Sequence, residues 1–134
     1  MTSAYRFIVG TLLLLLLLGF GLGGCSTGQS AMNNAAHSIE LIYFDGCPTT
    51  PPFRESLESA LGQTDGYEAL TPIDVTTLAE DDIRRGYGSP TILVDGRDLF
   101  GAGVPDSPMM SCRIYVGGTP DSQAIAAKLN ELTR

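Results

Sequence analysis

The sequence predicts an α/β domain in which one mixed β-sheet is covered by helices. Two short apolar runs, residues 39–44 and 91–94, have the length of buried strands, and each ends at an Asp-Gly pair. Segments with helical spacing of apolar residues follow such runs, which gives the order β-α-β-α-β-β-α. A strand–helix–strand unit implies parallel strands, whereas the last two strands pair most simply as antiparallel neighbours, so the sheet is expected to be mixed.

The first strand and the first helix of this domain are predicted by residues 39–62. The strand covers residues 39–44 and ends at Asp45-Gly46. Thr50 is expected to cap the following helix, Pro51 to occupy its first position and Gly62 to end it. The apolar residues of one helix face are Phe53, Leu57, Ala60 and Leu61.

A second strand and a short helix are expected between residues 68 and 86. The strand covers residues 68–75 and contains Pro72, which places it near an edge of the sheet or at a bend. The sequence from Thr77 to Glu80 is a capping-box pattern that opens a helix to Arg85. This helix would carry the ion pairs Glu80–Arg84 and Asp81–Arg85, one turn apart, and would end at Gly86.

The last part of the domain is predicted as two strands and a helix. The third strand is residues 91–94, an irregular loop follows over residues 97–110, and a fourth strand covers residues 112–116. Thr119 is expected to cap the last helix and Pro120 to begin it. Its apolar face is formed by Ile125, Leu129 and Leu132.

The residues before this domain predict export and anchoring. Residues 7–22 are free of charge and include seven consecutive leucines, a run that is short for a permanent span but typical of a signal-peptide core. Leu22-Gly23-Gly24-Cys25 after this core resembles the lipobox of bacterial lipoproteins, which implies cleavage after residue 24 and lipidation of Cys25. We therefore expect a signal peptide at 1–24, a lipidated cysteine and flexible tether at 25–37, and the domain at 38–134. An ordinary signal peptide, or a short span with an incidental Cys25, is the alternative.

The net charge of the chain and its expected export restrict the molecules that it can bind. The chain has 15 acidic and 8 basic residues, and only one base, Arg6, lies in the signal segment. The exported part is therefore acidic, without the Lys and Arg surplus that nucleic-acid binding requires. The expected partners are a lipid membrane, through acylated Cys25, and a protein or small-molecule thiol or disulfide. The expected location is the extracytoplasmic side of the bacterial cell envelope.

Cys47 lies between the first strand and the first helix, and Gly88-Ser89-Pro90 precedes the third strand. This combination of a cysteine loop and a proline loop resembles the thioredoxin-like superfamily. The segments 44–48, 88–96 and 111–115 are similar to small thioredoxin-like proteins often labelled alkylmercury lyase-like. The resemblance implies that Pro90 is a cis-proline and that an extended substrate pairs with the backbone at Ser89, beside Cys47.

Cys47 and Cys112 are the candidate catalytic residues. The second cysteine of a Cys-x-x-Cys motif is absent because position 50 is Thr50, and so Cys47 is a single thiol near a helix start. With Cys25 committed to lipid, Cys112 is the remaining thiol in an oxidising compartment, where it serves either as exchange partner or as half of a permanent disulfide. Such a bond across 65 positions would add about 4 kcal/mol by chain entropy. We expect thiol–disulfide exchange through Cys47 with Cys112 as partner.

Other functions remain open at this point. One is a non-catalytic binding module, in which Cys47 and Cys112 form a structural disulfide or bind a soft metal such as mercury, with Met109 and Met110 nearby. Another is alkylmercury lyase-like activity. The signature expected for such a lyase is a cysteine followed three residues later by an aspartate, and here Cys47 is followed by Thr50 at that position. No cofactor is expected, because zinc-ligand spacing, a Ser/His/Asp set and a nucleotide fingerprint are all absent from the sequence. The single histidine, His37, falls in the expected tether and is expected to be solvated.

Overall fold

The computed structural model describes residues 36–134, so the expected signal segment and Cys25 lie outside the described residues. Within the described part, no helix has the length and apolar character needed to cross a membrane. In chain order the elements are β1 (Ile39–Tyr43), α2 (Thr50–Leu61), β2 (Thr71–Asp74), η1 (Val75–Thr77), η2 (Ile83–Gly86), β3 (Thr91–Val94), β4 (Arg97–Asp98) and α3 (Ser122–Leu132). The two η elements are single turns of 3-10 helix.

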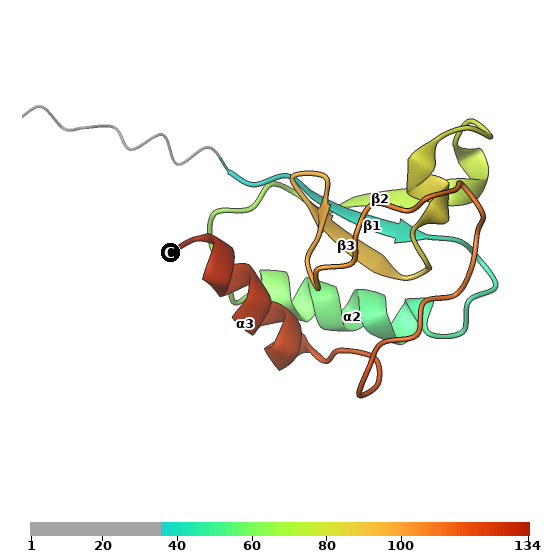
Figure 1. Ribbon diagram of the computed structural model, residues 1–134. Coiled ribbons are helices and arrows are strands. Elements are labelled where there is room, and N and C mark those ends of the chain that lie inside the picture. Colours follow the sequence, from blue (N-terminus) through green and yellow to red (C-terminus); the bar gives the residue numbers. More distant parts are fainter. Residues whose placement is uncertain (1–35) are drawn as a thin grey trace, which may run out of the picture. The chain divides into compact units, whose positions relative to one another are not determined.

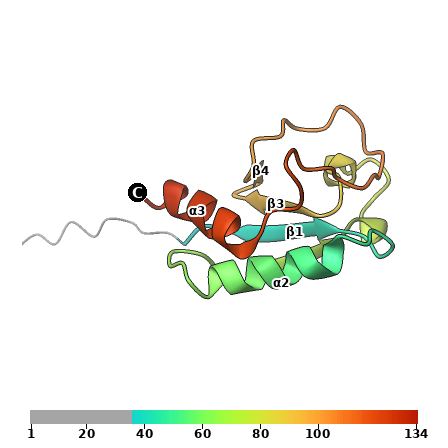
Figure 2. The same ribbon diagram turned by 90° about the horizontal axis from the view of Figure 1, so that it is seen from below.

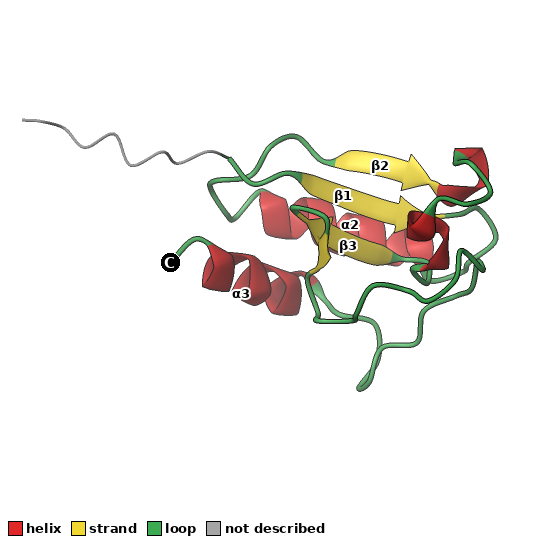
Figure 3. Cartoon of the chain, turned by 45° about the horizontal axis from the view of Figure 1, so that its top comes forward, coloured by secondary structure: helices red, strands yellow, loops and turns green. Residues whose placement is uncertain are grey.

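The sheet is mixed, as predicted, and has four strands. Their order is β2-β1-β3-β4, with β1 parallel to β2 and antiparallel to β3 (Figure 3). β3 and β4 form a hairpin through Asp95 and Gly96, whose φ angles of 49° and 75° suit a two-residue turn. The sheet places β2, with Pro72, at an edge, where a missing N–H costs no ladder bond.

Both long helices pack against the same face of the sheet (Figures 1 and 2). Residues 39 and 41 of β1 and residues 92 and 94 of β3 alternate toward this face, as the period of a strand requires. The buried residues of this core are Ile39, Leu41, Phe53, Leu57, Ala60, Ile92, Val94, Ile125 and Leu129. Two of the three apolar residues expected on the last helix are buried here, whereas Leu132 is half exposed.

The opposite face is covered by a smaller core, formed by Ile42, Val75, Tyr87 and Leu93. The predicted helix 77–85 is wrong, because residues 75–86 contain the two separate 3-10 turns η1 and η2 and no α-helix. The side chains of Asp74 and Asp82 each accept a hydrogen bond from the backbone N–H two residues later, at 2.9 Å. These side-chain bonds begin two separate turns in place of one helix.

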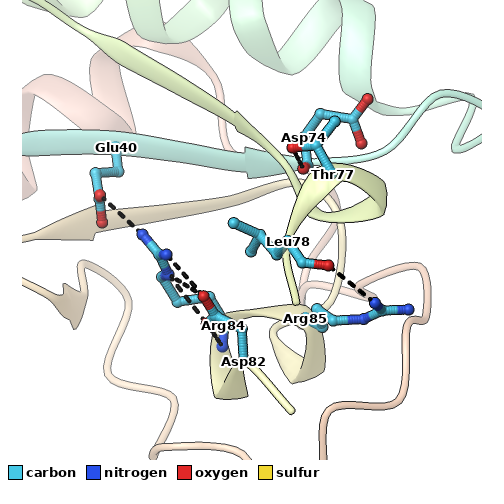
Figure 4. A network of polar contacts seen from close by, with 7 residues as sticks. All are labelled: Glu40, Asp74, Thr77, Leu78, Asp82, Arg84 and Arg85. Carbon is cyan, nitrogen blue, oxygen red and sulfur yellow. Dashed lines mark hydrogen bonds and ion pairs between the residues drawn. The ribbon is translucent and has the colours of Figure 1, made fainter. Parts of the chain in front are cut away.

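The ion pairs expected in this segment are also replaced (Figure 4). Arg84 lies 2.7 Å from Asp82 and 3.6 Å from Glu40 on β1, and Arg85 donates to the carbonyl oxygen of Leu78 at 3.2 Å. Hydrogen bonds from Arg84 are the main reason that the pKa of Asp82 is lowered to about 2. Arg84 therefore links the 3-10 segment to the sheet.

The helix starts differ from the prediction by one or two residues. α2 begins at Thr50 itself, with Thr49 at the capping position but without a side-chain capping bond. Asp121, rather than Thr119, caps α3 by accepting from the N–H of Ala124 at 2.8 Å. The hydroxyl of Thr50 makes a tertiary contact instead, at the site described below.

The predicted fourth strand is not formed. The edge of β3 is occupied by β4, and of residues 112–116 only Cys112 pairs, in an isolated parallel bridge with Ser89. The segment nevertheless keeps the alternation of a strand: Arg113 and Tyr115 are partly buried, whereas Ile114 and Val116 are exposed.

His37, expected in the tether, belongs to the folded part. Its N–H donates to the carbonyl of Gly66 at 2.7 Å, and its carbonyl accepts from the N–H of Glu68 at 2.9 Å. Its Nδ1 lies 2.6 Å from Oδ2 of Asp95 in the hairpin turn. The histidine therefore connects the start of the fold to the β3–β4 turn.

Candidate functional site: a buried and an exposed thiol

Cys47 lies in the loop between β1 and α2 and is only 3% exposed. Its carbonyl oxygen accepts from the N–H of Thr50 at 3.1 Å, which turns the chain into the helix. Its sulfur donates to the carbonyl oxygen of Ser89 at 3.1 Å and lies 3.4 Å from Oγ1 of Thr49. The thiol is therefore held by polar contacts on two sides.

Ser89 joins the three elements that surround this thiol. The residue is buried, and its hydroxyl accepts from the N–H of Phe44 at 3.2 Å, at the end of β1. The same hydroxyl is 3.0 Å from Oγ1 of Thr50 at the start of α2. The peptide bond from Ser89 to Pro90 is cis, as the sequence resemblance implies, and β3 begins directly after it.

The backbone of Ser89 brings Cys112 to the site. The N–H of Ser89 donates to the carbonyl of Ser111, and its carbonyl accepts from the N–H of Arg113, both at 2.8 Å. The approach is close: a Cβ on Gly88 would lie 2.9 Å from Cα of Arg113. Glycine at this position therefore allows segment 111–113 to lie against the cis-proline loop.

This pairing differs from the expectation that a substrate would use the backbone of Ser89. Both backbone groups of that residue are already occupied by the chain's own segment 111–113. Cys112 is the residue opposite Ser89, and it is exposed, whereas Cys47 is buried beneath. Both cysteines are free thiols.

The two thiols have pKa values shifted in opposite directions. Burial acts to raise the pKa of Cys47, but hydrogen bonds with Cys112, Thr49 and Ser89 outweigh it, so this pKa lies below its ordinary value. The pKa of Cys112 is raised, chiefly by its hydrogen bond to Cys47 and also by desolvation and the neighbouring charge. These opposite shifts favour Cys47 as the thiol that ionises first.

Arg113 holds the segment that carries Cys112. Its guanidinium forms a two-pronged ion pair with Asp98, whose side chain is completely buried, and donates to Oγ1 of Thr91 at 2.9 Å. It also lies 4.3 Å from the centre of the Tyr115 ring, and the hydroxyl of Tyr115 donates to the carbonyl of Pro90 at 2.9 Å. These contacts fix the segment on both sides of the cis-proline.

Four of the five predicted site residues thus meet at one place: Cys47, Ser89, Pro90 and Cys112. The fifth, Cys25, lies outside the described residues. Sequence reasoning missed Thr49 and Arg113. The alternation of residues 112–116 points the other way, because the apolar Cys112, Ile114 and Val116 would be taken as the inward row, whereas the structure exposes them and partly buries Arg113. Among residues 36–134, no group of three or more His, Cys, Asp or Glu side chains could hold a metal ion.

Comparison with known proteins adds no assignment to this geometry: no protein-family model, curated protein or solved structure matches the chain.

Proposed function

We propose that this chain is a thioredoxin-like protein that performs thiol–disulfide exchange, with Cys47 and Cys112 as the exchanging pair. The observation that carries the proposal is that Ser89 contacts both cysteines: its carbonyl oxygen accepts from the Cys47 sulfur, and its backbone pairs with Cys112. It joins two free cysteines that are 65 positions apart in the sequence. The thioredoxin-like assignment is supported by the mixed sheet, by the cysteine between β1 and α2, and by the cis-proline before β3.

The chemistry of such a pair is a transfer of two electrons and two protons. When the protein is oxidised, its two thiols form one disulfide, and a disulfide in the partner is reduced to two thiols. The depressed pKa of Cys47 raises its thiolate fraction, and the thiolate is the form that attacks or leaves. No metal or cofactor enters this exchange.

The test is a redox titration of the full chain in detergent, with Cys25→Ser so that two thiols remain. The protein is equilibrated with mixtures of reduced and oxidised glutathione and then alkylated, and its mass is measured by mass spectrometry to count the free thiols. We expect one internal disulfide that forms and opens reversibly, and that is lost in Cys47→Ser and in Cys112→Ser. A bond that resists excess dithiothreitol while the protein is folded would indicate a structural disulfide, and no bond at any ratio would also refute the proposal.

We also propose that residues 1–24 direct export and that Cys25 is lipidated. The support is the uncharged leucine-rich core followed by Leu22-Gly23-Gly24-Cys25. Acyl chains on Cys25 would anchor the domain to a membrane of the cell envelope. Expression in a bacterium with labelled palmitate is expected to label the chain and not its Cys25→Ala variant. Equal labelling of both would exclude this anchor.

A further inference from the structure

We propose that the partner's sulfur bonds to Cys112, and that Cys47 is the internal thiol that leaves or resolves. This inference rests on the proposed exchange function and assigns a different role to each of the two sulfurs. It also reverses the order expected from the sequence, in which exchange occurs through Cys47.

Access favours Cys112. Thiol–disulfide exchange requires the incoming sulfur to approach the sulfur that it attacks, so a covered sulfur reacts only after the fold opens. Cys47 is 3% exposed, and its sulfur donates to the carbonyl oxygen of Ser89, which also accepts from the N–H of Arg113. Cys112 is exposed.

The residue in contact with the Cys47 sulfur is firmly held. The carbonyl oxygen of Ser89 accepts from this sulfur, and to move Ser89 away from it both backbone hydrogen bonds between Ser89 and segment 111–113 would have to break. Arg113, at the end of this segment, would also have to leave Asp98, whose carboxylate is completely buried. Separating a buried ion pair is costly, because each charge would then lack a partner. Cys47 therefore stays covered under conditions in which Cys112 is free to react.

The exchange can be written with every bond accounted for, taking a protein dithiol as the partner. Starting from the oxidised chain, a partner thiolate attacks Sγ of Cys112, a partner–Cys112 disulfide forms, and the Cys47–Cys112 bond breaks. Cys47 leaves as the thiolate, which can accept a hydrogen bond from the hydroxyl of Thr49, 3.4 Å away. The partner's second thiolate then attacks the partner sulfur of the mixed disulfide, and Cys112 is released and takes up a proton.

The reverse direction uses the same contacts. Cys112 loses its proton to solvent, its thiolate attacks a partner disulfide, a Cys112–partner disulfide forms, and the partner's own S–S bond breaks with release of one partner thiolate. The Cys47 thiolate then attacks Sγ of Cys112, the internal disulfide forms, and the partner's second sulfur leaves as a thiolate. In both directions the mixed disulfide is on Cys112. Cys47 forms no bond with the partner and reacts only with Cys112.

The experiment compares two variants of the full chain that each keep one of the two thiols. Both carry Cys25→Ser, and one also has Cys47→Ser while the other has Cys112→Ser. Each is mixed with oxidised glutathione, and the glutathione adduct is followed by mass spectrometry. We expect the variant that keeps Cys112 to react at least about tenfold faster than the variant that keeps Cys47, because the latter must open first.

The same measurement in concentrated guanidinium chloride is the control. There both thiols are exposed, and the two rates are expected to become similar. A folded variant that keeps Cys47 and reacts as fast as the one that keeps Cys112 would overturn the inference.

A second measurement needs neither of these substitutions. The two-thiol chain is oxidised, treated briefly with reduced glutathione and quenched with acid, and the adduct is located by proteolysis. Adduct on Cys112 supports the inference, and adduct on Cys47 refutes it while leaving the proposed exchange function intact. If the internal disulfide never forms in that chain, the proposed function itself has failed.

Discussion

Replacing Arg113 with methionine is predicted to cost the fold about 3–5 kcal/mol, the range for breaking a buried ion pair by removing one partner. The Asp98 side chain is completely buried, and that of Arg113 is 15% exposed. Without the guanidinium, the carboxylate keeps only the backbone N–H groups of Phe100 and Ala102, at 2.7 and 3.2 Å. The loss is a large fraction of the roughly 5–15 kcal/mol that stabilises an ordinary domain.

Urea unfolding followed by circular dichroism measures this effect. With a slope of about 2 kcal/mol per M, the midpoint of the Arg113→Met variant should fall by about 1.5–2.5 M. The matched control is the double variant that also carries Asp98→Asn, which no longer leaves a charge without a partner. It should be more stable than Arg113→Met alone. A loss below about 1 kcal/mol in Arg113→Met, the range of an exposed ion pair, would refute this reasoning.

Three further predictions concern the site and the sheet. Gly88→Ala should force the overlying segment away and raise the alkylation rate of Cys47, read by mass spectrometry, whereas Gly103→Ala, with open space at its Cβ, should leave it unchanged. Tyr115→Phe keeps the ring and loses the hydrogen bond to the carbonyl of Pro90, so the free energy of unfolding should fall by about 1 kcal/mol. An unchanged free energy of unfolding would contradict this hydrogen bond and indicate that the hydroxyl is hydrated instead. Because the pKa of Asp82 is about 2 in the fold and about 4 when unfolded, its ionised form stabilises the fold above pH 4, and this contribution is lost as the pH falls from about 4 to about 2. The difference in urea midpoint between the native chain and Asp82→Asn should shrink over that interval, and a difference independent of pH would contradict this assignment.

The elements with strong local signals were predictable. Residues 39–43 and 91–94 are strands, and the residues of α2 that face the core are those with helical spacing. The 3-10 turns at residues 75–77 and 83–86 were not, because Asp74 and Asp82 compete for backbone N–H groups that a helix would leave to its own carbonyls. Capping-box residues in the sequence did not outweigh these two aspartates.

The site was predictable in its residues and not in its arrangement. The positions of Cys47 before the first helix and of Pro90 before the third strand indicated that these two loops meet. Cys112 was indicated because it is the one thiol left after Cys47 and the lipidated Cys25 are assigned. That segment 111–113 occupies the backbone of Ser89 depends on tertiary contacts, above all on Arg113 reaching Asp98. The alternation at residues 112–116 is typical of a strand. It does not reveal that β4 already occupies the edge of the sheet next to β3.

The direction of β1 determines how this domain would present its chemistry. The described chain begins at residue 36, just before β1, and Cys47 follows the opposite end of that strand (Figure 1). Five residues of strand separate the two ends by about 16 Å. A lipid on Cys25, as proposed above, would therefore attach the domain at the end of the sheet that is remote from the sulfurs. The end that carries Cys47 would remain accessible to soluble proteins and small molecules of the surrounding compartment.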